Sequence, residues 1–309
     1  MDDIAAPILT PAMQRAATPP AAPRHRALLA PLSPAEIRQA VAIVRADPAF
    51  GGSALFETIE VMDPPKSAVV NALPVDESGA PLQRRARANV FHADEPGVWK
   101  LTLSLDDSRI LTRDLFPAAR PMIQLEQFLA VEGWVKADPR FIAACALRGI
   151  TDMEKVCVDP WSAGNFGYAE EEGRLLCHTF AWLRLYADEA FYAHPIEGLN
   201  AVVDVKTGEV LRVDDRPGPP IAMTEVNYDS KFVQETLPAL KPLHIVQPEG
   251  VSFTLDGHHL AWDRWDFSIG FNAREGLTLH DIRFDGRPIV NRASLVEMVV
   301  PYGSPDRGH

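Results

Sequence analysis

Apolar residues follow two periods along the chain, first the spacing of a helix and then that of strands. A helix is predicted over residues 33–47, because Ile37, Val41 and Val44 share one helical face and the run Ser33-Pro-Ala-Glu36 fits an N-terminal capping box. Short apolar runs separated by Pro, Gly and Asp come next, as is typical of strands joined by turns. One helix followed by antiparallel strands predicts a small α+β domain. The strand-like runs cover residues 54–61, 67–73, 86–93 and 98–105.

The same design occurs a second time. A helix is predicted over residues 124–136, and the segment Val135-Lys-Ala-Asp-Pro-Arg-Phe141 at its end matches Val44-Arg-Ala-Asp-Pro-Ala-Phe50 at five of seven positions, 91 residues apart. Strand-like runs follow again, and the turn Lys206-Thr-Gly208 joins the last two. We therefore expect two related α+β modules in tandem. The predicted strands of the second module cover residues 155–158, 173–185, 199–205 and 209–213.

The last part of the chain has a different pattern, with strand signals and few helix signals. It follows a Pro/Gly-rich connector at 214–222 and a linker at 223–240. Its final apolar run lies close to the C-terminus, so that a sheet ending there would leave an apolar face and a strand edge without partners. The pattern thus predicts an incomplete sheet, with the aromatic residues around Trp262 and Trp265 packed as sheet core. The predicted strands cover residues 251–255, 260–271, 277–284, 287–294 and 295–300.

The amino-acid composition excludes some classes of binding partner. The chain has 309 residues and a formal net charge of -12, which disfavours nucleic acid and anionic membrane surfaces because binding to phosphates depends on cationic side chains. Residues 1–27 alternate Ala and Pro with charges and predict a flexible lead, unlike the apolar core of a signal peptide. No apolar run approaches the ~20 residues needed to span a bilayer. A cytoplasmic location is the resulting expectation.

Familiar catalytic and metal-binding motifs are absent from the sequence. The three cysteines, Cys145, Cys157 and Cys177, form no CxxC pair and are expected to be buried and inert. His258-His259 is expected in a turn, since neighbouring strand residues point to opposite faces and cannot both bind one ion. No HxH or HxxxH spacing, GxSxG elbow, Walker loop or dinucleotide fingerprint is present. The motifs therefore identify no catalytic, cofactor-binding or metal-binding residue.

Several long segments resemble one family. The run from Leu240 to Phe253, LKPLHIVQPEGVSF, closely resembles the stretch that introduces the catalytic β-sandwich of the copper amine oxidases. Shorter segments are similar to the second of that family's two small N-terminal α+β domains. The resemblance extends from about residue 28 to residue 303 and rests on long, specific motifs. The further matches are Trp265–Gly276, Leu279–Asp281 and Asn291–Gly303 in the last part, and Arg148-Gly149, Pro160–Gly164 and His194–Leu199 upstream.

The resemblance implies both a reaction and its cofactors. In this family a primary amine, dioxygen and water give an aldehyde, ammonia and hydrogen peroxide, in the context of amine metabolism. The family uses copper, held by three histidines, and topaquinone, which is formed from a tyrosine of the same protein. Those residues and an aspartate base lie beyond the segment matched by Asn291–Gly303, and Ser304 already departs from the aspartate usual there. We therefore expect this chain to bind neither cofactor and to be inactive by itself.

One segment imitates the site of the quinone. Thr224-Glu-Val-Asn-Tyr-Asp229 fits the pattern T-x-x-N-Y-[D/E] that surrounds the family's quinone tyrosine. It precedes the Leu240–Phe253 segment, however, and no HxH pair follows it to hold copper. Tyr228 is therefore predicted to remain an ordinary tyrosine. The resemblance instead singles out Trp161 and Tyr192, which match positions bordering the substrate funnel and are candidate funnel residues, although ordinary interface packing explains them as well.

Together these inferences predict an α+β chain with two tandem cystatin-like helix-on-sheet domains followed by the first strands of a large β-sandwich. The expected boundaries are 1–27 for the lead, 28–117 and 118–222 for the two domains, 223–240 for the linker and 241–309 for the sandwich. The leading interpretation is the N-terminal part of a copper- and topaquinone-dependent primary-amine oxidase, acting on a small primary amine and dioxygen as a homodimer. The alternative is a non-catalytic binding or scaffold module, and in a third reading a separate polypeptide supplies the remaining half.

Overall fold

The computed structural model of this chain describes residues 24–92, 95–163, 168–228, 232 and 240–296. Contacts between Cα atoms divide the chain into two compact units. The first unit contains the described parts of residues 1–32, 61–85 and 251–309, and the second contains those of 33–60 and 86–250. Residues 61–85 of the expected first α+β domain thus belong with the C-terminal strands.

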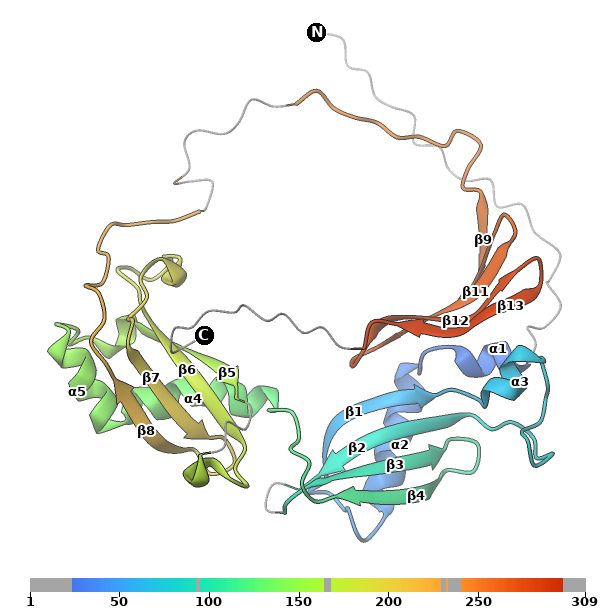
Figure 1. The fold of residues 1–309 in the computed structure, drawn as a ribbon, viewed down its shortest axis with the longest axis horizontal. Coiled ribbons are helices and arrows are strands. Elements are labelled where there is room, and N and C mark those ends of the chain that lie inside the picture. The colour runs from blue at the N-terminus through green and yellow to red at the C-terminus, as the bar shows by residue number, and fades with distance from the viewer. Residues whose placement is uncertain (1–23, 93–94, 164–167, 229–231, 233–239, 297–309) are drawn as a thin grey trace. The chain divides into compact units, whose positions relative to one another are not determined.

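The first α+β module begins with the helix that its sequence predicts. Helix α2 (Pro34–Ala46) begins with the capping box: the Ser33 hydroxyl accepts the Glu36 N–H at 3.2 Å, and the Glu36 carboxylate accepts the Ser33 N–H at 2.7 Å. Its buried residues are Ala40 and Val44, and it lies beside a four-stranded sheet of order β1-β2-β3-β4 (Figure 1). The strands are β1 (Leu55–Met62), β2 (Arg85–Phe91), β3 (Val98–Ser104) and β4 (Arg109–Phe116).

The second module places two helices on one face of its sheet. The buried core of this module includes Val131 and Val135 of α4 and Phe141 of α5. These side chains pack against every second residue of the strands, because successive strand residues point to opposite faces of the sheet. The outward residues of the same strands are left for the surface. The elements are α4 (Leu125–Ala137), α5 (Pro139–Leu147), β5 (Val156–Ser162), β6 (Leu176–Leu183), β7 (Leu199–Asp204) and β8 (Glu209–Asp215), with sheet order β5-β6-β7-β8 (Figure 1).

Three single turns of 3-10 helix complete the second module. They are η1 (Met153–Lys155) before β5, η2 (Ala169–Glu171) before β6, and η3 (Phe191–Ala193) between β6 and β7. The turn η3 matters for the site, because it lies close to the outer face of the β5–β6 pair through its two aromatic residues.

The C-terminal strands form a five-stranded antiparallel sheet whose two faces differ in chemistry. On one face Ser268, Thr278 and His280 are each 2% exposed. On the other face Phe271 and Leu277, which pair across the strands, are 70% and 56% exposed. The polar face is therefore the buried one among the described residues. The strands are β9 (Phe253–Asp256), β10 (His259–Trp262), β11 (Trp265–Asn272), β12 (Gly276–Phe284) and β13 (Arg287–Ser294), in the order β13-β12-β11-β10-β9.

Two short helices contact this sheet within the first unit. Helix α1 (Arg24–Leu29) contacts β11, and helix α3 (Lys66–Val70) contacts β13 (Figure 1). Leu28, Ala68 and Leu82 form a small buried cluster between these segments. Three arginines add long-range bonds: Arg26 to Asp266 at 2.9 Å, Arg283 to the Val69 and Val70 carbonyls at 3.1 and 3.0 Å, and Arg292 to Asp63 at 3.0 Å.

Several predicted elements were wrong or incomplete. Residues 67–70 of the predicted strand 67–73 belong to helix α3. The predicted strand 260–271 is two strands, β10 and β11, joined by a turn at residues 263–264, where Asp263 has a φ of +53°. Strand β4 was not predicted. The last four residues of the predicted flexible lead, 24–27, lie in helix α1. In the predicted strand 295–300, residues 295–296 form no strand and the rest lie outside the described residues.

Side-chain burial also differs from the prediction in the last sheet. Trp265 packs on Phe284 with ring centroids 4.8 Å apart, but Trp262 is 53% exposed, so the aromatic residues are only partly sheet core. The burial of all three cysteines is confirmed. Burial raises the pKa of the Cys145 thiol to about 11 and that of Cys177 to about 12. No helix within the described part of the chain has the length and apolar character that crossing a bilayer requires.

Candidate functional site

The outer face of strands β5 and β6 carries an unusual set of side chains. Because strand residues alternate, Asp159 and Trp161 of β5 point away from the helix-covered core, and the register places Asp159 opposite Phe180 of β6. Trp182 is two residues further along β6 on the same face. We call Asp159, Trp161, Phe180, Trp182, Phe191 and Tyr192 the aromatic wall.

Asp159 joins two parts of this wall that are distant in sequence. Its Oδ2 atom accepts the indole Nε1–H of Trp161 at 3.0 Å and the hydroxyl of Tyr192 at 2.9 Å. Trp161 is 57% exposed and Tyr192 is 56% exposed, so both rings reach solvent while their polar ends are held. The carboxylate thus lies between two accessible aromatic rings.

Ring contacts fix the rest of the wall. Trp161 meets Phe180 edge to face at a centroid distance of 6.2 Å, and Trp182 meets Tyr192 in the same way at 4.7 Å. Phe191 and Tyr192 are 4.4 Å apart. Edge-to-face pairs of this kind add stability beyond the area they bury, so the rings support one another.

The electrostatics of the wall favour a cationic ligand. The hydrogen bond to Asp159, with lesser contributions from burial and from the negative charge, raises the pKa of Tyr192, so its hydroxyl stays a donor. The Arg184 guanidinium lies 5.0 Å from the Phe191 ring centroid, which shows that a ring of this wall already accepts a cation on its face. An ammonium group near Asp159 would find a carboxylate oxygen and aromatic faces together.

The two residues singled out from the sequence are brought together by the structure. Trp161 and Tyr192 lie 31 positions apart in the chain, yet both donate to one carboxylate oxygen. Their role at a substrate funnel stays a prediction. The sequence analysis missed Asp159, although a signal was present: a residue two positions before Trp161 on a strand must share its face.

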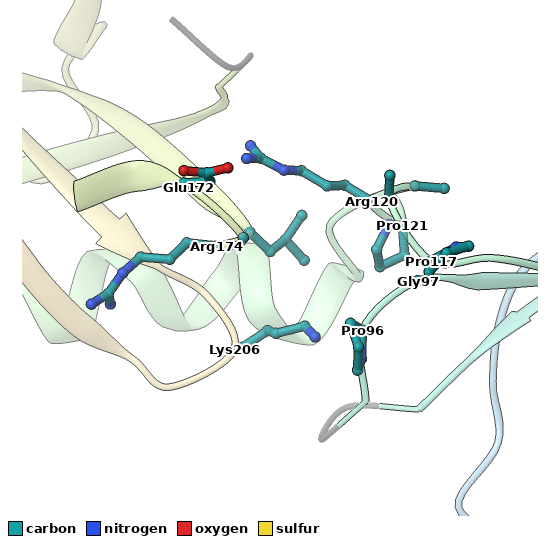
Figure 2. Close-up of a pocket in the computed structure, with 12 residues that line it drawn as sticks. Pro96, Gly97, Pro117, Arg120, Pro121, Glu172, Arg174 and Lys206 are labelled. Carbon is teal, nitrogen blue, oxygen red and sulfur yellow. The ribbon is translucent and has the colours of Figure 1, made fainter. Parts of the chain in front are cut away.

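A separate cavity of about 300 Å³ lies in the second unit, between the segment after β4 and the segment before β6 (Figure 2). None of the aromatic wall residues lines it. Its cationic side chains are already bound: Arg174 to the Asp204 and Glu209 carboxylates, Lys206 to the Glu95 carbonyl and Arg120 to the Glu171 carbonyl. These bonds favour a structural junction over a ligand site.

A copper site requires several ligand side chains that point at one ion, and the described residues do not form such a site. Within the ranges that the structure describes, no three His, Cys, Asp or Glu side chains are grouped so as to hold a metal ion. The buried histidines His194 and His280 instead face the carboxylates of Glu189 and Asp63. Tyr228 is 74% exposed, and Asp229 of the same motif lies outside the described residues.

Comparison with known domains covers most of the chain. Residues 28–114 match the domain described as "Copper amine oxidase, N2 domain", and residues 126–232 match "Copper amine oxidase, N3 domain". Residues 254–309 match "Copper amine oxidase, enzyme domain". The three matches follow the order of the two α+β modules and the C-terminal strands.

Individual relatives agree with these matches. The chain is 41% identical over 281 residues to the primary amine oxidase of Arthrobacter sp. (strain P1), covering 89% of this chain and 42% of that protein. It is 37% identical over 282 residues to the histamine oxidase of Arthrobacter globiformis, covering 89% and 40%. Among solved structures, a copper-containing benzylamine oxidase from Hansenula polymorpha superimposes with a TM-score of 0.75 at 27% identity, covering 90% of this chain and 46% of that one.

The chain spans about two fifths of the length of the curated relatives that it matches. The matched part contains both small domains and the beginning of the enzyme domain. From this agreement of domain order, fold and sequence, the chain belongs to the copper amine oxidase family, a family of oxidoreductases, and represents its N-terminal portion.

Proposed function

We propose that this chain is the substrate-access part of a copper- and topaquinone-dependent primary-amine oxidase. The observation that carries the proposal is the Asp159 carboxylate held between the exposed rings of Trp161 and Tyr192. A primary amine is an ammonium ion at neutral pH, and carboxylates and aromatic faces are the protein groups that attract such an ion. The amine itself is suggested by the family, whose members oxidise primary amines.

The residues of this chain would bind and orient the amine before it is oxidised. The rings would exclude water from one side of the amine's hydrocarbon part, and Asp159 would orient its ammonium group. Copper and topaquinone would supply the redox chemistry of the family, but the described residues do not fit a copper site, so we derive no step through either group. We further propose that residues 1–309 alone do not oxidise amines.

A chimeric enzyme tests the access role. Residues 28–303 would replace the corresponding part of the Arthrobacter sp. (strain P1) primary amine oxidase, to which this chain is 41% identical over 281 residues. We expect an active chimera in which Trp161→Ala and Tyr192→Phe raise KM for the amine by roughly threefold to tenfold, as expected for losing one cation–π or hydrogen-bond contact, with kcat little changed. An unchanged KM in both variants would remove the support for this role.

The isolated chain tests the second part of the proposal. Purified residues 1–309 would be assayed for bound copper and for peroxide release with a primary amine, and we expect neither. Copper in a one-to-one ratio together with peroxide release would contradict the proposal. The alternative, a non-catalytic binding or scaffold module, gains support if the isolated chain is a stable, well-folded monomer.

Location and assembly complete the proposal. We propose a cytoplasmic homodimer, with the dimer resting on the family resemblance. Light scattering after size-exclusion chromatography of the chimera would report its mass, and a monomer would refute the homodimer.

A further inference from the structure

Glu189 and His194 form a fully buried pair directly behind the aromatic wall. Both side chains have no exposed surface, and His194 Nε2 lies 2.9 Å from Glu189 Oε1. The other ring nitrogen of His194, Nδ1, lies 2.6 Å from the carbonyl oxygen of Ala222, in the connector that leaves the second module. Neither residue belongs to the wall, and the sequence analysis assigned neither a role of its own.

Both ring nitrogens of His194 have a hydrogen-bond partner. A carbonyl oxygen can only accept, so Nδ1 of His194 must donate to Ala222. Glu189 accepts the backbone N–H of Leu185 at 2.6 Å and that of Val226 at 3.3 Å. Burial opposes the ionisation of Glu189, but the bonds from His194 and these N–H groups outweigh it and lower its pKa. His194 is therefore held at both ring nitrogens, with Nδ1 bonded to the Ala222 carbonyl and Nε2 bonded to the Glu189 carboxyl group.

The pair closes a short loop around the residues that complete the wall. Only residues 190–193 separate Glu189 from His194, and they include Phe191 and Tyr192 of η3. The backbone of His194 is fixed as well, since its carbonyl accepts the Leu183 N–H at 2.9 Å at the end of β6. The position of the Tyr192 hydroxyl relative to Asp159 thus depends on a loop tied at both ends.

Hydrogen bonds also connect this loop to the connector and to the first part of the linker. Beside the bonds to Ala222 and Val226, the Asn227 side chain donates to the Tyr186 hydroxyl at 3.3 Å and to the Asp188 carbonyl at 3.0 Å. A buried ion pair contributes little net stability compared with an apolar pair, but removing one partner leaves an uncompensated charge. Such a pair is better suited to fixing geometry than to adding stability.

We propose that Glu189 and His194 are positioning residues that hold Tyr192 against Asp159 in the arrangement that receives the ammonium group of a primary amine. This inference rests on the proposed function of the aromatic wall for its ligand. The placement of Tyr192 by the pair can be tested without any ligand.

The first experiment follows the Trp161 indole Nε1–H by ¹H–¹⁵N NMR in the full chain, with Trp161→Phe to identify the peak. Glu189→Gln and His194→Gln are each expected to shift this peak, because Tyr192 leaves Asp159 and the second bond to that oxygen is lost. Tyr192→Phe, which spares the buried pair, should produce a similar shift. The matched control is Glu275→Gln, which removes a buried carboxylate from the other compact unit and should leave the peak in place.

The second experiment measures ligand binding by the same peak. Wild-type chain is titrated with 2-phenylethylammonium chloride and with 2-phenylethanol, a neutral compound of similar shape. We expect saturable binding of the ammonium compound alone, weakened roughly threefold to tenfold by His194→Gln and by Tyr192→Phe, the loss expected for one polar contact to a cation. The Glu275→Gln chain should bind as wild type.

The outcomes separate the two proposals. An unmoved Trp161 peak in a folded His194→Gln chain overturns the positioning role, whatever the ligand result. Failure of the wild-type chain to bind the ammonium compound refutes the amine-receiving function of the wall, while the variant peaks still decide whether the pair holds Tyr192. If the Gln variants do not fold, the ¹⁵N shifts of the His194 ring in wild type decide, since an Nδ1 atom without a proton would contradict the bond to Ala222 on which the argument depends.

Discussion

The repeated Val-x-Ala-Asp-Pro-x-Phe segment shows how single residues set the design of both modules. Asp47 ends helix α2 and Asp138 ends helix α4, each through a backbone N–H bond of 3.1 Å to the valine carbonyl three residues earlier. Each carboxylate then accepts the N–H two residues further on, that of Ala49 at 3.0 Å and that of Arg140 at 2.8 Å. The valine and phenylalanine of both copies are buried. Three of the five matching positions, those of the valine, the aspartate and the phenylalanine, therefore have a structural role.

Acid should weaken the first unit through one buried carboxylate. Hydrogen bonds from Arg292 and Asn272 and the charges of Arg292 and Arg274 lower the pKa of Glu275 to about 2, although its burial opposes this. Since the folded pKa lies below the unfolded value, the stabilisation is complete above about pH 4.5 and is lost as the pH falls toward 2. Urea unfolding from pH 7 to pH 3 measures it.

Two matched variants test whether Glu275 causes the loss of stability in acid. We expect Glu275→Gln to lower the free energy of unfolding at pH 7 by on the order of 3 kcal/mol and to flatten its dependence on pH. Glu249→Gln, which changes an exposed carboxylate, should retain the wild-type dependence. Equal acid sensitivity in all three chains would show that Glu275 is not responsible.

Tyr228 should show no sign of oxidation to a quinone. It is 74% exposed and the described residues place no metal-binding group at it, so nothing would drive its modification. Wild-type chain and Tyr228→Phe, both incubated with copper and air, should stain equally weakly with a carbonyl reagent such as phenylhydrazine. Staining that is present in wild type and absent in the variant would overturn this assignment.

The candidate site shows how far residue-level reading of the sequence could go. The resemblance drew attention to Trp161 and Tyr192, and strand alternation could have added Asp159. The Glu189–His194 pair could not be predicted, because its other partners, Ala222 and Val226, come from the connector and the linker, whose paths no local pattern indicates.

At the level of elements, helix α3 shows why a local pattern can mislead. Its sequence, Lys66-Ser-Ala-Val-Val70, contains β-branched residues that favour a strand. In the structure Arg283 donates to the carbonyls of Val69 and Val70, at the end of the helix where such groups lack partners. That partner is more than 200 positions away, so the sequence around α3 carried no sign of it. The helices α2 and α4 and most strands, which depend on local capping and alternation, were predicted correctly.

The close approach of β11 and β12 makes one glycine sensitive. A Cβ atom on Gly270 would lie 2.4 Å from Thr278 Oγ1 and 3.0 Å from His280 Nε2, two atoms that are bonded to each other at 2.9 Å. We expect Gly270→Ala to reduce the free energy of unfolding by about 1–3 kcal/mol, the usual range for overpacking. Gly52→Ala, where no atom lies within 4 Å, should change it by less than about 0.5 kcal/mol. Thermal or urea unfolding compares them, and equal stabilities would refute the steric argument.

At the level of the whole molecule, the uncovered apolar face of the last sheet should govern solution behaviour. Phe271 and Leu277 are more than half exposed on it, which is unusual for large apolar residues side by side. We expect the isolated chain to bind an apolar dye such as ANS and to self-associate, and the double variant Phe271→Ser, Leu277→Thr to do both less. Light scattering against concentration measures this, and identical curves for the two proteins would remove the face as the cause.

The bonds from β11 and β12 to the earliest described helices also impose an order on biosynthesis. Arg26 meets Asp266 across 240 positions, and the carbonyl of Val70 meets Arg283 across 213. At ribosomal speeds of about 5–20 residues per second, the second of these partners emerges roughly 10 to 40 seconds after the residue it must bind. During synthesis, helices α1 and α3 therefore cannot form these bonds until strands β11 and β12 have been translated.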